Sequence, residues 1–236
     1  METTYHDHAM ITTAVEGACR VVTLDRPARR NALTRAGLDD VRTAVTDADE
    51  PVVYLRGAGD AFCAGADLDI VADLDAEDAP AFARKGQRVA TAIEAADSVV
   101  VAGVDGAARG GGVELALACD LRLATDRATF AESGVTLGLF GAWGGTARLP
   151  RVVGEADAMD LALSGRVVDA AEALRMGLVS RVVDDPRAVA DDLAANDHEA
   201  LRVLKTRMRD DASPARQEAR EAEAFAHLIE RADFDR

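Results

Sequence analysis

The residues best suited to chemistry lie between positions 99 and 125. An apolar, β-branched run from Val99 to Val104 predicts a buried strand, and Gly110, Gly111 and Gly112 follow it in a row. The next residues favour a helix. This order presents bare backbone N–H groups and the positive end of a helix dipole to a ligand oxygen. Glu114 comes three residues after Gly111, on the same helix face, so an acid beside an anion site indicates catalysis.

Simpler interpretations of the same residues exist. Glycines also serve only to make tight turns. An exposed acid in a first helical turn, such as Glu114, complements the helix dipole by only ~0.3–1 kcal/mol.

Hydrophobic patterns predict the elements that must position this stretch. A hairpin over 11–24 turns at Glu16-Gly17, and a helix capped by Thr34 runs to about Asp47. The acidic stretch 69–78 is predicted to be a mobile surface segment. We expect further strands at 52–56, 120–124, 128–131 and 179–183, and further helices at 80–96, 113–118, 155–163, 169–176, 187–194, 197–210 and 214–231. The pattern divides the chain into a core over 1–154 and an α-helical region over 155–236.

Composition bounds the class of protein. A chain of 236 residues can form one sizeable core, and 49% hydrophobic but only 4% aromatic residues predict a core rich in Ala, Val and Leu. The net charge of −15 repels phosphate backbones, so no nucleic-acid partner is expected. Lysine occurs only at Lys85 and Lys205. Acidity with so little lysine favours a salt-accumulating halophile over an ordinary acidic cytosolic protein.

Cysteine usage and the chain start point to the cytoplasm. Cys19, Cys63 and Cys119 are odd in number and far apart in apolar surroundings, which predicts free buried thiols in a reducing compartment. The first ten residues lack the apolar region of a signal peptide, and no apolar run approaches the ~20 residues of a membrane helix.

Other catalytic and metal motifs are absent from the sequence. No phosphate-binding loop, dinucleotide fingerprint or serine-hydrolase motif is present. The four histidines are at His6, His8, His198 and His227, near the ends of the chain, so no metal site is expected. Trp143, in a glycine-rich loop, either closes a pocket or packs in the core, and packing is favoured.

Four separated blocks resemble the crotonase family, the enoyl-CoA hydratase/isomerase superfamily. They are RVVTLDRPARRNALT (20–34), AFCAGADL (61–68), GAARGGGVELALACDLRLAT (106–125) and LGLFGAWGGTARLPRVVG (137–154), in the family's order and spacing. The match covers nearly the whole chain. The resemblance implies an α/β fold, a spiral of ββα units with a C-terminal helical trimerisation region. It also implies a homotrimer or a dimer of trimers.

The resemblance makes the N–H groups of Ala66 and Gly111 an oxyanion hole for a thioester enolate. Loss of one such donor typically costs about 2.7–4 kcal/mol of barrier. It also implies coenzyme A contacts at Arg30, Ala32, Ala64, Asp67, Leu68 and Gly110. No separate cofactor is expected, because coenzyme A is part of the substrate. Whether the Arg30 side chain reaches a phosphate or is an ordinary solvated charge stays open.

Glu114 matches the first of the two catalytic glutamates of the family's hydratases, whereas Gly134 stands where the second is expected. Glu132 is two residues earlier, on the same face of the expected strand but displaced by roughly 6–7 Å. It either substitutes as the second acid through a water or is a surface residue. The surface interpretation is favoured, so Glu132→Gln is expected to have a mild effect and hydration to be slow.

The resemblance therefore predicts an enoyl-CoA hydratase, in which Glu114 activates the water that adds to Cβ. A single carboxylate also suffices for the isomerase alternative, which moves a double bond. A non-enzymatic alternative is a family member that binds coenzyme A or RNA. The net charge argues against RNA, and the intact Glu114 argues against an inactive scaffold.

Overall fold

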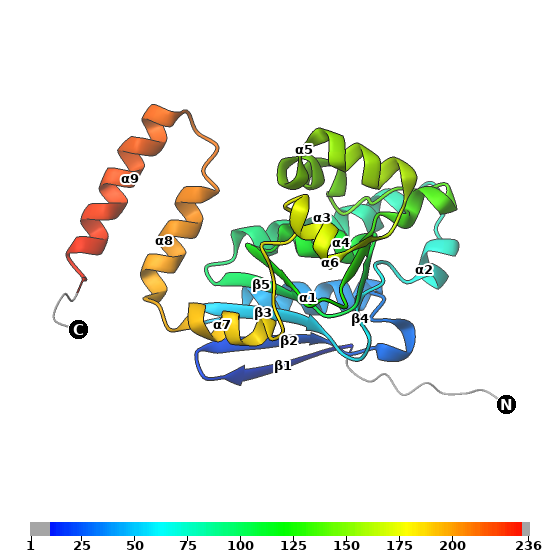
Figure 1. Ribbon diagram of the computed structural model, residues 1–236, viewed down its shortest axis with the longest axis horizontal. Coiled ribbons are helices and arrows are strands. Elements are labelled where there is room, and N and C mark those ends of the chain that lie inside the picture. Colours follow the sequence, from blue (N-terminus) through cyan, green and yellow to red (C-terminus); the bar gives the residue numbers. More distant parts are fainter. Residues whose placement is uncertain (1–9, 233–236) are drawn as a thin grey trace.

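A computed structural model describes residues 10–232 of the chain. The helices and strands form an α/β body, and the last two helices of the chain project from one end of it (Figure 1). No helix within the described range is both long enough and apolar enough to cross a membrane.

The larger sheet forms the centre of the body. Its strand order is β1-β2-β3-β5-β7-β10; β1 and β2 pair antiparallel, and the other pairs are parallel. All six residues of β5 are buried, as predicted for the run that precedes the glycines. The strands are β1 (Ile11–Glu16), β2 (Cys19–Leu24), β3 (Val52–Gly57), β5 (Val99–Val104), β7 (Leu121–Ala124) and β10 (Arg181–Val182).

A smaller sheet of short strands, which the sequence patterns largely missed, holds the catalytic loops. Its order is β4-β6-β8-β9. The strands are β4 (Ala61–Cys63), β6 (Ala107–Arg109), β8 (Thr129–Ala131) and β9 (Val168–Asp169). Each leads directly into, or pairs beside, a segment that lines the candidate site. Such short strands carry too few residues for an alternating pattern to be recognised.

Helices cover the sheets, and most of them were predicted. The Thr34 hydroxyl accepts from the Gly37 N–H and caps α1, as expected. The acidic stretch predicted to be a mobile surface segment begins in the short helix α2 and lies at the surface, with none of the α2 residues buried. The helices of the body are η1 (Pro27–Arg29), α1 (Arg35–Thr46), α2 (Leu68–Ala72), α3 (Ala79–Ala95), α4 (Gly111–Ala118), η2 (Ser133–Leu137), α5 (Gly145–Ser164), α6 (Ala170–Arg175) and α7 (Pro186–Ala194).

The chain does not leave the core at residue 154. That boundary falls inside α5, where Gly154 has a φ of 79° and bends the helix into two arms. Beyond it, β9 pairs with β8 and β10 pairs with β7, so residues after 154 complete both sheets.

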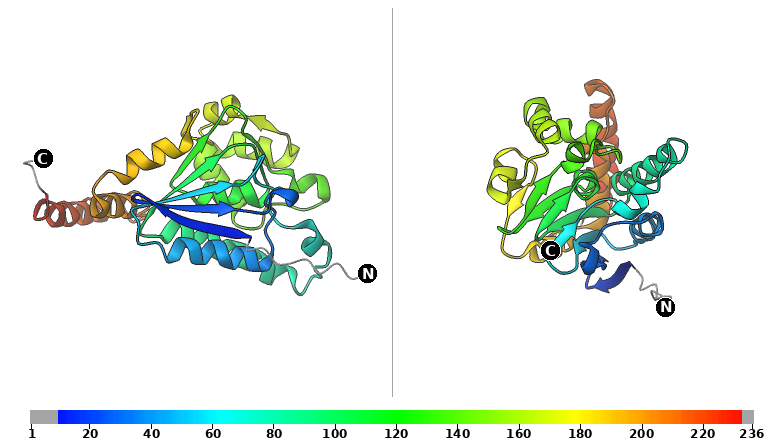
Figure 2. Two further views of the ribbon diagram at one scale, coloured as in Figure 1. Left: turned by 90° about the horizontal axis from the view of Figure 1, so that it is seen from below. Right: turned by 90° about the vertical axis from the view of Figure 1, so that its right-hand side faces the viewer.

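The last two helices, α8 (His198–Met208) and α9 (Pro214–Ile229), project from the body side by side (Figures 1 and 2). Lys205 anchors α8: its ammonium is buried, contacts Asp120 at 2.9 Å and donates to the Ser98 carbonyl. Helix α9 buries none of its residues.

Candidate active site

Glu114 is held in place by the loop that precedes α5. Its side chain, 1% exposed, projects from the first turn of α4. Its Oε1 accepts from the backbone N–H groups of Trp143, at 2.8 Å, and Gly145, at 2.6 Å. A Cβ at Gly145 would lie 2.8 Å from the same Oε1, so a larger residue there would displace the carboxyl group. The carboxyl group therefore has a fixed orientation.

Burial raises the pKa of Glu114 to about 7, and the two N–H donors only partly oppose this. A carboxyl with this pKa is near half ionised at neutral pH. It can accept a proton and release it again with little cost, which is the property of a general base. This environment argues against the interpretation of Glu114 as an exposed acid that complements a dipole.

The backbone at Ala66 lies next to the start of α4. Gly65, with a φ of 87°, allows this approach, because a Cβ there would lie 2.8 Å from the Gly111 nitrogen. Within residues 10–232, neither the Ala66 nor the Gly111 N–H donates a hydrogen bond to another group. Two free N–H groups close together suit a developing oxyanion.

A cavity of about 220 Å³ joins these groups. Ala66, Gly111 and Glu114 all line it, and apolar side chains from α2, α3 and η2 complete the wall. Trp143 both lines the cavity and packs, with its ring 6.1 Å from that of Phe82. Gly111 and Gly86 leave room for the indole, since a Cβ at either would clash with it.

Gly134 lies in η2 and lines the same cavity, so no carboxylate extends from that position. The strand expected to carry both Glu132 and Gly134 ends at Ala131. A Cβ at Gly134 would meet the Phe140 Cα at 3.1 Å. The backbone there tolerates a side chain only if the neighbouring loop moves slightly.

Glu132 is not a surface residue, which corrects the favoured interpretation. Its side chain is 7% exposed, and Oε1 is buried without a hydrogen-bond partner among the described residues. Burial, and then the neighbouring charge of Glu114, raise its pKa to about 9. A Cβ on Gly141 would lie 2.9 Å from Glu132 Oε2 and 3.0 Å from Glu114 Oε2, so the two carboxyl groups converge on one glycine.

The segments predicted to contact coenzyme A fall into two groups. Ala64, Leu68 and Gly110 line the Glu114 cavity together with the oxyanion groups. Arg30 lines a separate cavity of about 390 Å³, which Ala64 and Arg109 also border. Ala64 therefore lines both cavities. Ala32 is buried and borders neither of them.

Asp67 supports the loop through its side chain. Its carboxylate pairs with Arg26 and with Arg29, the latter at 3.2 Å, and caps α2 through the Asp69 N–H. Burial alone would raise the pKa of Asp67, but Arg26 and the other donors hold it below the ordinary value. The charged pair fixes the Ala66 loop against η1.

Sequence reasoning missed the roles of Gly141, Gly145 and the buried Glu132. A signal for Glu132 was available, since an acid directly after the apolar residues Phe130 and Ala131 is placed where a strand ends inside the body. The glycines gave no such signal, because glycine in a loop is common. The three cysteines are free and buried, as predicted. The described residues hold no cluster of His, Cys, Asp or Glu that could bind a metal.

The fold and this cavity define a class: an α/β protein in which a buried carboxyl group and two free backbone N–H donors line one cavity. The sequence profile of the enoyl-CoA hydratase/isomerase family matches residues 14–235, and the chain belongs to that family. The predicted crotonase-type fold is thereby confirmed. Solved structures agree: an enoyl-CoA hydratase from Bacillus anthracis is 31% identical, with a TM-score of 0.88 over 94% of this chain and 91% of that one.

Among characterised or named relatives, a crotonyl-CoA hydratase of Syntrophomonas wolfei is 43% identical over 146 residues, which are 60% of this chain and 56% of the relative. A probable enoyl-CoA hydratase of Mycobacterium bovis is 42% identical over 153 residues, 62% of this chain and 58% of the relative. The matched stretch thus spans less than two thirds of either relative's length.

Proposed function

We propose that this protein hydrates a 2-enoyl-CoA thioester. The observation that carries the proposal is the single cavity that the Glu114 carboxyl and the free N–H groups of Ala66 and Gly111 all line. The relatives named crotonyl-CoA hydratase and enoyl-CoA hydratase support the same reaction.

In the proposed mechanism the thioester oxygen accepts from Ala66 and Gly111. Ionised Glu114 takes a proton from a water molecule as its oxygen adds to Cβ, and the electron pair of the double bond moves to the thioester as an enolate. The two N–H donors stabilise this oxyanion. Neutral Glu132 is the second acid, which gives a proton to Cα and completes the addition of H and OH. Its burial and its convergence with Glu114 on Gly141 support this role.

After one catalytic cycle, the starting protonation states are restored if the proton gained by Glu114 passes to Glu132. The pKa order supports this direction, because Glu132, at about 9, holds a proton more tightly than Glu114, at about 7. Each step is an addition or a proton transfer, so we propose that no cofactor is needed beyond the coenzyme A that the substrate carries.

We place coenzyme A along the loops that join the two cavities. Ala64, Leu68 and Gly110 would contact the pantetheine arm, and Arg30 would face the phosphates, since it borders the adjoining cavity. Asp67 and Ala32 contribute through the support of these loops, because both side chains are buried.

Incubation with crotonyl-CoA and, separately, with a 3-enoyl-CoA tests the reaction. The expected result is loss of the 2-enoyl thioester absorbance with formation of the 3-hydroxyacyl product. Consumption of the 3-enoyl thioester alone would instead establish the isomerase. One observation favours that second candidate: Glu114 is the only carboxylate among the described residues that lines the cavity with the N–H donors, since Glu132 borders a neighbouring one.

We also propose a trimer, or a dimer of trimers, in the cytoplasm of a halophile. Helices α8 and α9 expose apolar side chains, among them Met208 at 80% and Phe225 at 65%, which a neighbouring copy would cover. Three free buried thiols suit a reducing compartment. The net charge of −15 with two lysines supports the halophilic origin.

A further inference from the structure

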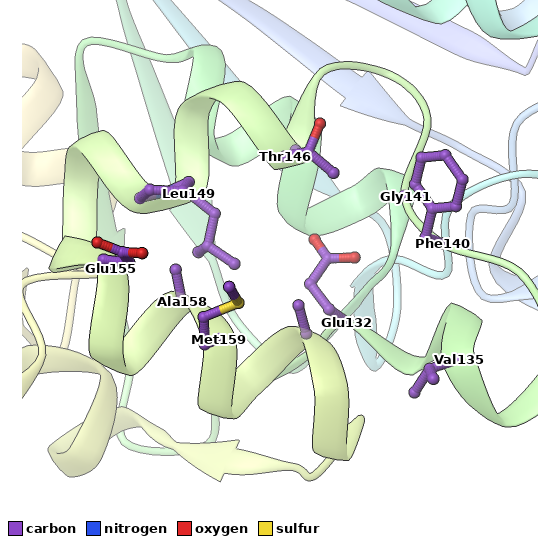
Figure 3. A pocket seen from close by; sticks show the side chains of 12 residues that line it. Glu132, Val135, Phe140, Gly141, Thr146, Leu149, Glu155, Ala158 and Met159 are labelled. Carbon is purple, nitrogen blue, oxygen red and sulfur yellow. The ribbon is translucent and has the colours of Figure 1, made fainter.

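A second cavity adjoins the Glu114 cavity across the segment Phe140–Gly141. Its volume is about 420 Å³, in the range of small-molecule sites, and it lies between η2 and the two arms of α5 (Figure 3). Its lining is mostly apolar and includes Val135, Leu149, Pro150, Ala158, Met159 and Ala162.

Glu132 extends from the end of β8 into this space, toward the α5 arms (Figure 3). Its Oε1 is buried and has no hydrogen-bond partner among the described residues. A buried polar atom without a partner is costly, and folded proteins keep few of them. The mostly apolar lining, with this one unpartnered oxygen, therefore fits an uncharged organic ligand.

The two cavities adjoin at one shared wall. Phe140 and Gly141 line both of them. Glu114 and Glu132, one from each cavity, converge on the position that a Gly141 Cβ would occupy. For an acyl chain whose reacting carbons lie beside Glu114, the larger cavity is therefore on the other side of Phe140 and Gly141. The side chain of Phe140, at this boundary, is exposed.

We propose that the cavity beyond Glu132 binds the distal, uncharged part of the acyl chain, so that the preferred substrates are medium-chain enoyl-CoA thioesters rather than crotonyl-CoA. This inference rests on the proposed function, because it assumes that the thioester lies in the Glu114 cavity.

Electrostatics narrows the class of chain further. Glu132 is neutral at physiological pH, because burial raises its pKa to about 9, and Glu155 borders the same cavity. Neither group attracts a carboxylate. A chain that ends in a carboxylate is therefore excluded, whereas an alkyl chain or one that carries a hydroxyl group is accepted.

The test compares binding of two unreactive saturated thioesters, butyryl-CoA and decanoyl-CoA, by calorimetry. Wild-type protein is expected to bind decanoyl-CoA more tightly. Two variants fill the cavity: Ala158→Leu at its buried wall, and Ala162→Phe at its exposed edge, where folding is not at risk. Each should weaken decanoyl-CoA binding by about tenfold and leave butyryl-CoA binding unchanged. The matched control is Ala156→Phe, exposed on the same arm of α5 but outside the cavity lining, which should change neither.

Equal loss for both thioesters, or no loss for either, in Ala162→Phe would overturn the proposal. So would loss of the oligomer in light scattering with an unchanged ratio of the two affinities, because the cavity would then be a subunit contact. Hydration assays with crotonyl-CoA and trans-2-decenoyl-CoA separate a failure of the proposed reaction from a failure of the chain-length inference. A shifted affinity ratio without any hydration would refute the proposed reaction and leave the chain-length inference standing.

Discussion

At the scale of single residues, the proposed chemistry depends on two carboxyl groups that differ in their surroundings. Glu114 accepts two backbone hydrogen bonds, whereas the Glu132 Oε1 accepts none. Both are buried, so both have raised pKa values, but the group without donors has the higher one. The pair can therefore hold one base and one acid at the same pH.

Replacement of Glu114 by Gln keeps the size of the side chain and removes the base. We expect kcat for hydration to fall by about a hundredfold or more, with acyl-CoA affinity largely retained. Steady-state kinetics and a binding titration measure the two effects separately. Near-native turnover in Glu114→Gln would exclude this residue from the mechanism.

The pH profile of kcat/KM should be bell-shaped. Activity needs ionised Glu114, so it should rise as pH increases through about 7. It also needs protonated Glu132, so it should fall as pH increases through about 9. Glu132→Gln should lower kcat by about tenfold or more and remove the alkaline limb. The sequence-based expectation that Glu132→Gln has a mild effect assumed a surface residue. A mild effect with an intact alkaline limb would show that Glu132 has a purely structural role.

At the scale of elements, the loop from Gly138 to Gly145 determines how much space the site has. Between η2 and α5 it supplies both N–H donors to Glu114 and packs Phe140 against Gly134. Ser133 and Gly134, the first two residues of η2, both line the Glu114 cavity.

Gly134→Glu tests this arrangement, because it places a carboxyl at the position where the family resemblance predicts the second acid. The Cβ would press on Phe140 Cα, 3.1 Å away, so some stability should be lost. Gly134→Ala, with the same Cβ and no carboxyl, is the control. We expect similar melting temperatures for the two variants but faster hydration by Gly134→Glu than by Gly134→Ala. Equal rates would show that a carboxyl at this position contributes nothing.

At the scale of the whole molecule, α8 and α9 project at one end of the body (Figure 1). Both helices expose apolar side chains. Burial of such side chains stabilises association by roughly 25 cal/mol per Å² of apolar surface. We expect light scattering to give a trimer or a hexamer. Met208→Glu and Phe225→Glu, which place charges on these helices, should shift the mass toward a monomer. A stable, active monomer of the unaltered chain would contradict the assembly.

The acidic surface predicts a dependence of stability on salt. With a net charge of −15, repulsion between carboxylates opposes the compact state and is screened as ionic strength rises. The melting temperature should therefore increase with KCl toward molar concentrations. Equal melting temperatures in low and high KCl would remove the support for a halophilic origin.

The sequence by itself determined the features that depend on neighbours along the chain. The hairpin at Glu16-Gly17, the Thr34 cap and the strand–glycine–helix order around Gly111 follow from local patterns, since caps, turns and hydrophobic periods act over a few residues. The family followed from four ordered blocks, and the profile match over residues 14–235 confirms it.

Only the tertiary structure decided the surroundings of Glu132. The small sheet whose strand β8 ends just before it joins β4, β6, β8 and β9 across more than a hundred residues, by pairings that no local pattern encodes. Because burial sets its pKa, the same Glu132 that the sequence favoured as a surface residue becomes a neutral acid beside Glu114. The second cavity likewise arises only where η2 and the bent α5 meet in space.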